Sequence, residues 1–306
     1  MEETKSKHQK IVYTPRKFTW IDISDPTTAE TSYLKRHYKF HELDLEDCLS
    51  VSERPKIDDY DDYLFIVLHI PQRKKGKIIS GELNLFIGQN FFITLHGANP
   101  IIGKVFEKCK KSKKFKEEYM GKGSGYLLYL LIDNLFESGF PLVDELNKQL
   151  NEIEIEVFDR DYSQDRLKDI LVLKKDIINF RRFIMPQRAI IAQLEHKNKK
   201  FLPENLDVYF DDVVDKIEKM WNSLENLQEL TASVQETNES IISHNTNNVI
   251  KILTVFSVVM LPLSVITGFY GMNVRGLPFV EHTSPVLVIS GILLTVAVVM
   301  IGFFKY

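Results

Sequence analysis

The chain has 306 residues, which is enough for a sizeable hydrophobic core and for one or two domains. Its formal net charge is −3, so no overall positive charge attracts nucleic acid, and no nucleic-acid partner is expected. Charged residues form 26% of the chain, yet residues 252–270 and 285–304 contain none. This uneven distribution predicts a large soluble part followed by a membrane anchor.

The cysteines and the N-terminus indicate the compartment of the soluble part. Cys48 and Cys109 lie far apart in the sequence, and two free thiols in a reducing compartment are favoured over a disulfide. The opening MEETKSKHQK leads into a short apolar run, not into the long apolar segment of a secretory signal. We therefore expect the soluble part to stay in the cytoplasm.

Residues 1–125 are expected to form a mixed α/β domain. Runs rich in aromatic and β-branched residues predict strands at residues 18–23, 63–70, 82–88 and 90–96. The sequence KKGK at 74–77 is suited to the tip of a hairpin between the second and third of these strands. Helices are predicted over residues 28–39 and from Asn99-Pro100 to the lysine-rich segment 108–116.

Long helices are expected after this domain, because no glycine occurs between Gly139 and Gly268. The first is predicted over about 126–161 and the second over about 164–194, and together they form a helical hairpin domain at residues 126–203. The third begins after Pro203 and forms a stalk at residues 204–250 that can continue unbroken into the membrane.

The stalk helix carries a seam with alternating three- and four-residue spacing, as in a coiled coil. Its apolar members are Phe210, Val213, Ile217, Met220, Leu224, Leu227 and Val234. The same seam later carries the polar residues Thr231, Asn238, Asn245 and Asn248. A seam that becomes rich in amides toward the membrane is what symmetry-related helices would show if they separated around water.

The two uncharged segments predict a transmembrane hairpin. The first span is placed at residues 251–273, the external loop at 274–284 and the second span at 285–306. Apolar segments of about 20 residues cross a hydrocarbon layer of about 30 Å. Lys251 and Lys305 against Arg275 weakly favour cytoplasmic ends, and the large untranslocated domain is the stronger reason to place both termini in the cytoplasm.

The first span ends in Tyr270-Gly271-Met272-Asn273. With this Gly-Met-Asn motif in a C-terminal hairpin, the chain resembles the CorA family of magnesium and cobalt transporters. The resemblance covers most of the chain, including the segments at residues 43–68, 126–135, 209–215 and 245–254. It implies a funnel-shaped homopentamer in the cell (inner) membrane. Each chain would supply an α+β cytoplasmic domain, a long stalk helix and two C-terminal transmembrane helices.

A polar stripe follows one face of the first span and the end of the stalk. Its members are Asn247, Ile250, Thr254, Ser257, Leu261, Ser264, Gly268 and Gly271. The stripe alone favours a helix-packing face, because small residues are common at such faces in membranes. With the five-fold symmetry that the resemblance implies, a pore face is the better interpretation. The resemblance places Asn247, Ile250, Leu253, Leu261, Ser264 and Asn273 along the pore.

The resemblance implies a selectivity filter at Gly271, Met272 and Asn273. Five asparagine amides at the outer mouth would hydrogen-bond the water shell that Mg²⁺ releases reluctantly. Neutral groups would also avoid trapping the ion, and Ile250, Leu253 and Leu261 would form apolar constrictions. A simple helix cap at the motif is the structural alternative, and both roles can hold together.

Two departures from the family pattern concern charge. The loop after the motif holds Arg275 and a single acid, Glu281, so cation capture at the mouth would be weaker. The chain also ends in GFFKY without a basic cluster. The lysine-rich segments 108–116 and 197–200 would replace that cluster, although solvated surfaces are the commoner role of such segments.

The resemblance also implies regulation by divalent ions bound between cytoplasmic domains. Asp47 and Asp212 match acids that meet across a subunit interface, and Glu46 and Asp133 match acids nearby. A bound ion relieves the repulsion between paired carboxylates, so loss of the ion would loosen the interface. Each acid taken singly is more simply a surface charge.

The expected function is passive, potential-driven transport of Mg²⁺, with Co²⁺ and Ni²⁺ as further cargo, and with Mg²⁺ also as the regulator. A divalent ion gains about 4.6 kcal/mol across 100 mV, so no ATP is required. The segment 97–105 has five residues between its glycines and Val105 after its lysine, so it is not a phosphate loop. No nucleotide or organic cofactor is therefore expected.

An enzyme is not expected, because the eight histidines are scattered without a metal-ligand spacing. Two alternatives remain: a zinc-transporting relative of the same fold, and a membrane-anchored coiled-coil scaffold that carries no ions.

Overall fold

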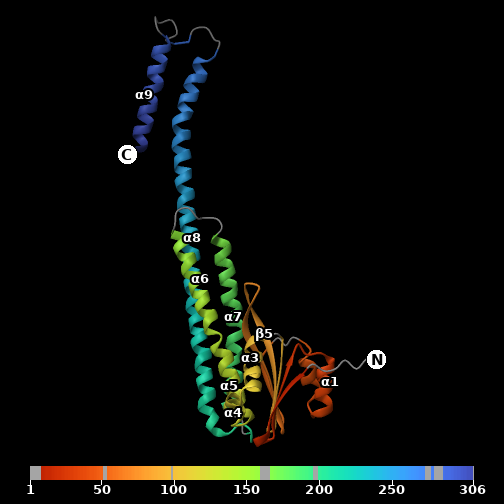
Figure 1. The fold of residues 1–306 in the computed structure, drawn as a ribbon. Coiled ribbons are helices and arrows are strands. Elements are labelled where there is room, and N and C mark those ends of the chain that lie inside the picture. The colour runs from red at the N-terminus through yellow and green to blue at the C-terminus, as the bar shows by residue number, and fades with distance from the viewer. Residues whose placement is uncertain are drawn as a thin grey trace. The chain divides into compact units, whose positions relative to one another are not determined.

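The computed structural model of the protein describes residues 8–50, 54–97, 99–158, 166–195, 199–272, 277–278 and 285–305 (Figure 1). The chain divides into two compact units, Met1–Gln235 and Glu236–Tyr306. The first unit contains a sheet with helices on both faces, and the second contains the apolar helices.

The sheet of the first unit has six strands in the order β1-β2-β6-β5-β4-β3. Its strands are β1 (His8–Tyr13), β2 (Phe18–Ser24), β3 (Lys56–Asp59), β4 (Tyr63–Lys74), β5 (Lys77–Gly88) and β6 (Phe91–His96). Neighbours are antiparallel except β2 and β6, which are parallel. The four predicted strands are confirmed. The strands β1 and β3 are additional.

The β4–β5 hairpin turns at Lys75 and Gly76, inside the predicted KKGK tip. Lys74 pairs with Lys77, and both turn residues have positive φ angles of 51° and 76°. A two-residue turn of this hand matches the right-handed twist of the strands, and glycine adopts such a φ without strain. The hairpin prediction is therefore confirmed.

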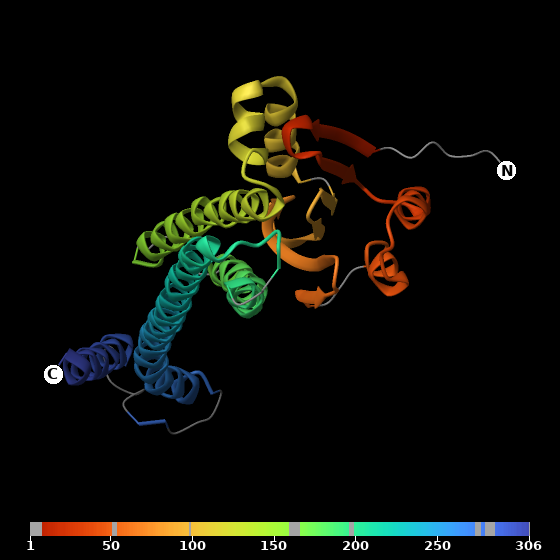
Figure 2. The same cartoon turned by 90° about the horizontal axis from the view of Figure 1, so that it is seen from below.

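One face of the sheet packs against α1 (Thr28–His37) and α2 (Glu42–Asp47). Leu34 and Leu45 from these helices are buried with alternate residues of the strands, including Ile21, Phe65 and Phe86. Thr27 caps α1 through a capping box with Glu30, which satisfies backbone N–H groups at the start of the helix. Figure 2 shows α1 and α2, in red and orange, beside the sheet.

The other face packs against α3 (Pro100–Lys111), α5 (Ser124–Glu137) and α7 (Arg166–Glu195), with α4 (Lys113–Met120) beyond α3. Trp20 of β2 makes edge-on contacts with Phe92 and Phe106. The Gln187 side chain of α7 donates a buried hydrogen bond of 2.6 Å to the carbonyl oxygen of His69 in β4. Both Cys48 and Cys109 are buried free thiols, as the sequence predicted.

The helix predicted over about 126–161 is two helices, which corrects the sequence interpretation. The first, α5, ends at Glu137, and α6 runs over Phe140–Phe158. Ser138 donates its hydroxyl to the carbonyl oxygen of Leu135, which satisfies one end of α5. Pro141 lies in the first turn of α6, where a missing N–H costs nothing. The apolar periodicity across the break is continuous, so periodicity alone could not reveal it.

The third predicted helix is α8 (Asp207–Tyr270), preceded by the short η2 (Glu204–Leu206). It is continuous over 64 residues. The apolar seam from Phe210 to Val234 is buried inside the first unit, where Arg181 of α7 pairs with Glu225 at 3.3 Å. This part of the seam is therefore covered by the chain's own helices, and no symmetry-related subunit is needed to bury it.

The second unit holds the remainder of α8 and α9 (Pro285–Lys305). Among the described residues, α8 is the one helix long and apolar enough to cross a membrane, with a mean hydropathy of 2.4 over its best window. In α9 the apolar run Val286–Met300 is shorter. The loop between them contributes only residues 277–278 to the described part of the chain.

Candidate ion pathway and regulatory site

The predicted pore face is exposed along the second unit. The side chains of Asn247, Thr254, Ser257 and Ser264 are exposed, and so are the apolar Ile250, Leu253 and Leu261 at 54%, 61% and 66%. Every residue from 243 to 254 is exposed. An exposed apolar surface of this extent on a helix calls for lipid or other subunits to cover it.

Two threonine hydroxyl groups of this helix donate to the backbone of the preceding turn. Thr254 donates to the carbonyl oxygen of Ile250 at 2.7 Å, and Thr267 donates to that of Leu263 at 2.9 Å. Such bonds lower the cost of placing a hydroxyl in an apolar medium. Because each donor is used, the hydroxyl oxygen remains able to accept a hydrogen bond from water.

Little space is available for a side chain at position 271, at the end of α8. The Gly271 N–H donates to the carbonyl oxygen of Thr267 at 2.9 Å, and the Met272 N–H donates to that of Phe269 at 3.3 Å. A Cβ at position 271 would lie 3.0 Å from the Thr267 oxygen, which is a close approach. Asn273, Arg275 and Glu281 lie outside the described residues.

Two of the predicted regulatory acids come together in one chain. Asp133 of α5 and Asp212 of α8 both contact Lys216, with the Asp212 carboxylate 3.4 Å from Nζ. Glu137, one turn after Asp133, lies 3.4 Å from the same Nζ. Burial disfavours the ammonium, but the hydrogen bond and attraction of Asp133 outweigh it and raise the pKa of Lys216 above its ordinary value. Lys216 is therefore charged at neutral pH.

Asp47 lies in a second cluster of the same kind. At the end of α2 it contacts Lys56 Nζ at 2.6 Å, and Asp58 of β3 contacts the same nitrogen at 2.6 Å. Desolvation is again outweighed by hydrogen bonds, here to Asp47 and Asp58, so the pKa of Lys56 is raised. Glu46 is exposed beside this cluster.

Neither cluster is a complete metal site within one chain. Across the described ranges, no group of three or more His, Cys, Asp or Glu side chains is arranged to hold a metal ion. The predicted pairing of Asp47 with Asp212 concerns two subunits and stays a prediction. The two lysines were missed from the sequence, although Lys216 follows Asp212 by four residues and therefore shares its helical face.

The two lysine-rich segments differ in their surroundings. Segment 108–116 ends α3 and begins α4, and Lys108, Lys111 and Lys113 in it are exposed. In segment 197–200, residues 197 and 198 lie outside the described part of the chain, and Lys199 is held by Asp59 at 2.7 Å. Lys199 thus already has an anionic partner in its own chain.

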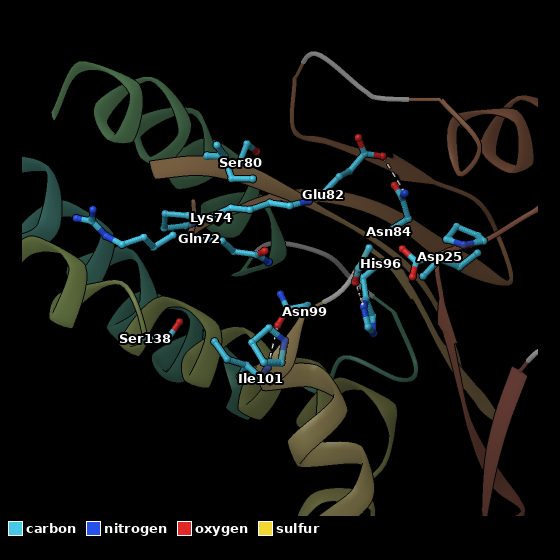
Figure 3. Close-up of a pocket in the computed structure, with 18 of the residues that line it drawn as sticks. Asp25, Gln72, Lys74, Ser80, Glu82, Asn84, His96, Asn99, Ile101 and Ser138 are labelled. Atoms are coloured by element: carbon cyan, nitrogen blue, oxygen red, sulfur yellow. Dashed lines mark hydrogen bonds between the residues drawn. The ribbon is translucent and has the colours of Figure 1, made fainter. Parts of the chain in front are cut away.

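A hollow of about 770 Å³ lies at the carboxyl end of β6, beside the segment that superficially resembles a phosphate loop. Figure 3 shows His96, Asn99, Asp25 and Glu82 around it. Asn99 caps α3, and its Oδ1 accepts the N–H groups of Ile101 at 3.0 Å and Ile102 at 3.4 Å. Because Asn99 already uses these two N–H groups, they are not free to bind a phosphate. Ala98 of this segment lies outside the described residues.

Comparison with known proteins decides the family. The model of the CorA-like Mg²⁺ transporter protein family matches residues 15–305, which is nearly the whole chain. The chain belongs to the CorA-like Mg²⁺ transporter family. The resemblance drawn from the Gly-Met-Asn motif is confirmed, and the chain is an ion transporter and not an enzyme.

Two relatives and one solved structure illustrate the similarity. YfjQ of Bacillus subtilis is 29% identical over 291 residues, covering 94% of this chain and 88% of its own. The cobalt/magnesium transport protein CorA of Thermotoga maritima is 27% identical, covering 94% and 82%. The structure of the CorA magnesium transporter from Methanocaldococcus jannaschii matches with a TM-score of 0.84 at 21% identity, covering 96% and 92%. This last match confirms the fold, an α+β sheet domain followed by a long helix.

Proposed function

We propose that this CorA-family chain forms a funnel-shaped homopentamer in the cell membrane and conducts hydrated Mg²⁺, with Co²⁺ and Ni²⁺ as further cargo. Five copies of α8 surround the pore, the stretch 285–306 forms an outer ring against lipid, and both termini lie in the cytoplasm. The observation that carries the proposal is the stripe from Asn247 to Ser264, exposed in the single chain on a helix that continues without a break from the soluble unit.

The stripe suits an ion that keeps its water. Amides and hydroxyls offer oxygen atoms to the hydration shell, while Ile250, Leu253 and Leu261 narrow the path and can close it by dewetting. Mg²⁺ loses its waters reluctantly, so selection of the hydrated ion costs less than selection of the bare ion. The membrane potential drives the flux, at about 2.3 kcal/mol per charge per 100 mV.

In this proposal, the selectivity filter is the ring that Gly271, Met272 and Asn273 of the five subunits form. The five Asn273 amides contact the water shell at the outer mouth, and Gly271 allows the close backbone approach that aims them inward. Neutral amides bind a divalent ion weakly enough to release it, as conduction requires.

In this proposal, cytoplasmic Mg²⁺ closes the channel. The ion binds between Asp47 of one subunit and Asp212 of its neighbour, with Glu46 and Asp133 close by. When Mg²⁺ is scarce, carboxylates facing one another repel, the interface loosens and the pore opens. The clustering of Asp133 and Asp212 on one surface supports this role.

The test is Mg²⁺ uptake into proteoliposomes that contain the purified full-length protein, an internal fluorescent indicator and an inside-negative potential. Wild type should take up Mg²⁺ in proportion to the potential, and Asn273→Ala should lose most of the uptake. The matched control is Asn151→Ala, an exposed asparagine on α6, which should keep wild-type flux.

The outcomes separate the candidate functions. Equal Mg²⁺ uptake by wild type and Asn273→Ala would show that the selectivity filter does not lie at the Gly-Met-Asn motif. No uptake of Mg²⁺ by correctly inserted wild type, with Mg²⁺ low on the domain side, would contradict the channel; a Zn²⁺ flux in the same vesicles would then favour the zinc relative, and no flux of either ion would favour the scaffold.

A further inference from the structure

The Lys216 ammonium lies among three carboxylates, at a position that would also attract a bound cation. Its Nζ contacts Asp133 and lies 3.4 Å from oxygen atoms of both Glu137 and Asp212. The Lys216 side chain is 20% exposed and Asp133 is 21% exposed, so water screens this contact only in part. Glu137 and Asp212 are 62% and 58% exposed, and water screens their contacts with Lys216 more strongly. The three acids carry a formal charge of −3, and one ammonium leaves −2.

An ammonium and Mg²⁺ make competing demands on these oxygen atoms. Mg²⁺ needs oxygen ligands at about 2.0–2.1 Å in near-octahedral geometry, or the same oxygens as acceptors for its bound waters. The lysine Nζ already takes one oxygen from each of Asp133, Glu137 and Asp212 into its contact shell. A divalent ion that uses these oxygens must therefore displace the ammonium or share its partners.

The same arrangement recurs where the other half of the proposed regulatory site lies. Lys56 Nζ is 2.6 Å from both Asp47 and Asp58, and these three side chains are each about one-third exposed. Both acids that would face each other across the interface, Asp47 and Asp212, thus carry a lysine of their own chain. Because a lysine contacts two or more carboxylates in both clusters, the arrangement is not well explained as a chance surface ion pair.

We propose that Lys216 and Lys56 are resident cations that compete with Mg²⁺ for the regulatory carboxylates, and so raise the Mg²⁺ concentration at which the channel closes. This inference rests on the proposed gating by inter-subunit Mg²⁺. In the absence of Mg²⁺ each lysine also lessens the repulsion among the acids of its own chain. The chain would consequently respond to higher Mg²⁺ concentrations than a version with bare carboxylates.

The experiment uses the full-length protein and Mg²⁺ itself as the probe. The free Mg²⁺ concentration that gives half the maximal rise in the thermal unfolding midpoint is measured in detergent, because a ligand bound only by the folded state raises that midpoint. The concentration for half-maximal inhibition of uptake, applied on the domain side of proteoliposomes, gives a second value. Lys216→Gln should lower both values about fivefold, since one contact charge near 4 Å is worth about 1 kcal/mol in water.

Two variants control for charge and for folding. Lys219→Gln removes the same charge from an exposed position less than one turn further along α8, and should leave both values within twofold of wild type. Lys56→Gln should lower both values in the same direction as Lys216→Gln. Lys56→Gln therefore tests the inference independently if Lys216→Gln proves too unstable to measure.

The outcomes distinguish the inference from the function on which it rests. If wild type shows no Mg²⁺ response and Asp212→Asn behaves like wild type, the regulatory site itself is wrong and the inference falls with it. If wild type responds, Asp212→Asn requires more Mg²⁺, and yet Lys216→Gln and Lys56→Gln are unchanged or require more Mg²⁺, the regulatory site stands and the resident-cation inference is overturned.

Discussion

Asp22 and His96 form a buried ion pair near the carboxyl ends of the neighbouring strands β2 and β6. The His96 Nε2 lies 3.1 Å from Asp22 Oδ1, and Thr94 donates its hydroxyl to the same carboxylate oxygen at 2.5 Å. Burial disfavours the charged ring, but the hydrogen bond and attraction of Asp22 outweigh it and raise the pKa of His96 above 6.5. A pair of this kind ties local stability to pH.

The pH dependence of stability follows from the direction of that shift. Because the folded pKa of His96 lies above the unfolded value, its contribution to the free energy of unfolding is fully present below about pH 6.5 and is lost as the pH rises through the folded pKa. Asp22→Asn should abolish this loss and should cost about 1–3 kcal/mol, because buried donors lose a partner. Thermal unfolding from pH 5.5 to 8.5 measures both effects.

The control is His37→Asn, which removes an exposed histidine from α1 and should keep the wild-type slope. An Asp22→Asn protein that loses stability with pH as steeply as wild type would contradict the assignment of this slope to His96.

Helix packing depends on a small residue at the start of α5. A Cβ at Gly125 would lie 2.2 Å from the carbonyl oxygen of Phe201 and 3.0 Å from a methyl group of Leu202, so the backbone of this segment occupies the space of a side chain. Gly125→Ala should therefore destabilise the protein by about 1–3 kcal/mol, as overpacking does.

The matched control for this prediction is another helical glycine. A Cβ at Gly103 in α3 would meet no atom within 4 Å, so Gly103→Ala should be neutral or should stabilise by up to about 1 kcal/mol. Chemical denaturation of the two variants measures the difference. Equal stability of both would show that the 199–206 segment yields to accommodate a methyl group.

The elements that the sequence predicted well are those whose signals are local. Runs of aromatic and β-branched residues and the turn chemistry at Lys75-Gly76 predict the β4–β5 hairpin without reference to the rest of the fold. The short β3 and α2 were missed, because four and six residues carry too little periodicity. The apolar seam of α8 was assigned to symmetry mates, since three- and four-residue spacing is the same for packing within a chain and between chains.

Placing the candidate site required the tertiary structure. Asp133 and Asp212 are far apart in sequence, and only the crossing of α5 and α8 brings them to one lysine. The family resemblance supplied Asp212 as an interface acid and Asp133 as an acid nearby, but no contact between them within a chain. By contrast, Gly271 and Met272 were identified from the motif alone, because a short contiguous pattern needs no fold to be recognised.

At the scale of the whole molecule, the chain separates a charged folded unit from a unit whose helices are left uncovered. The apolar window of α8 has no buried residues in the single chain. Within the first unit, by contrast, the seam of the same helix is packed. One helix thus serves two environments, and it is assigned as continuous over both.

The stripe is either a pore face or a helix-packing face, and measuring which side chains water reaches distinguishes the two. Ser257 belongs to the stripe, and Val259 lies about 200° further around the helix. Ser257→Cys should react with a charged, water-soluble thiol reagent applied on the domain side, and should lose most of its Mg²⁺ uptake as the pore is blocked. Val259→Cys should face helices or lipid, should stay unmodified and should keep its uptake.

The native thiols do not disturb this measurement. Cys48 and Cys109 are buried, and burial raises the pKa of Cys109 to about 11, so little reactive thiolate forms at neutral pH. Modification of Val259→Cys in place of Ser257→Cys would mean that the stripe is a dry packing face and that water follows the opposite side of the helix. The amides and hydroxyls of the stripe would then serve helix association, and the conduction path would have to be sought on the face that carries Val259.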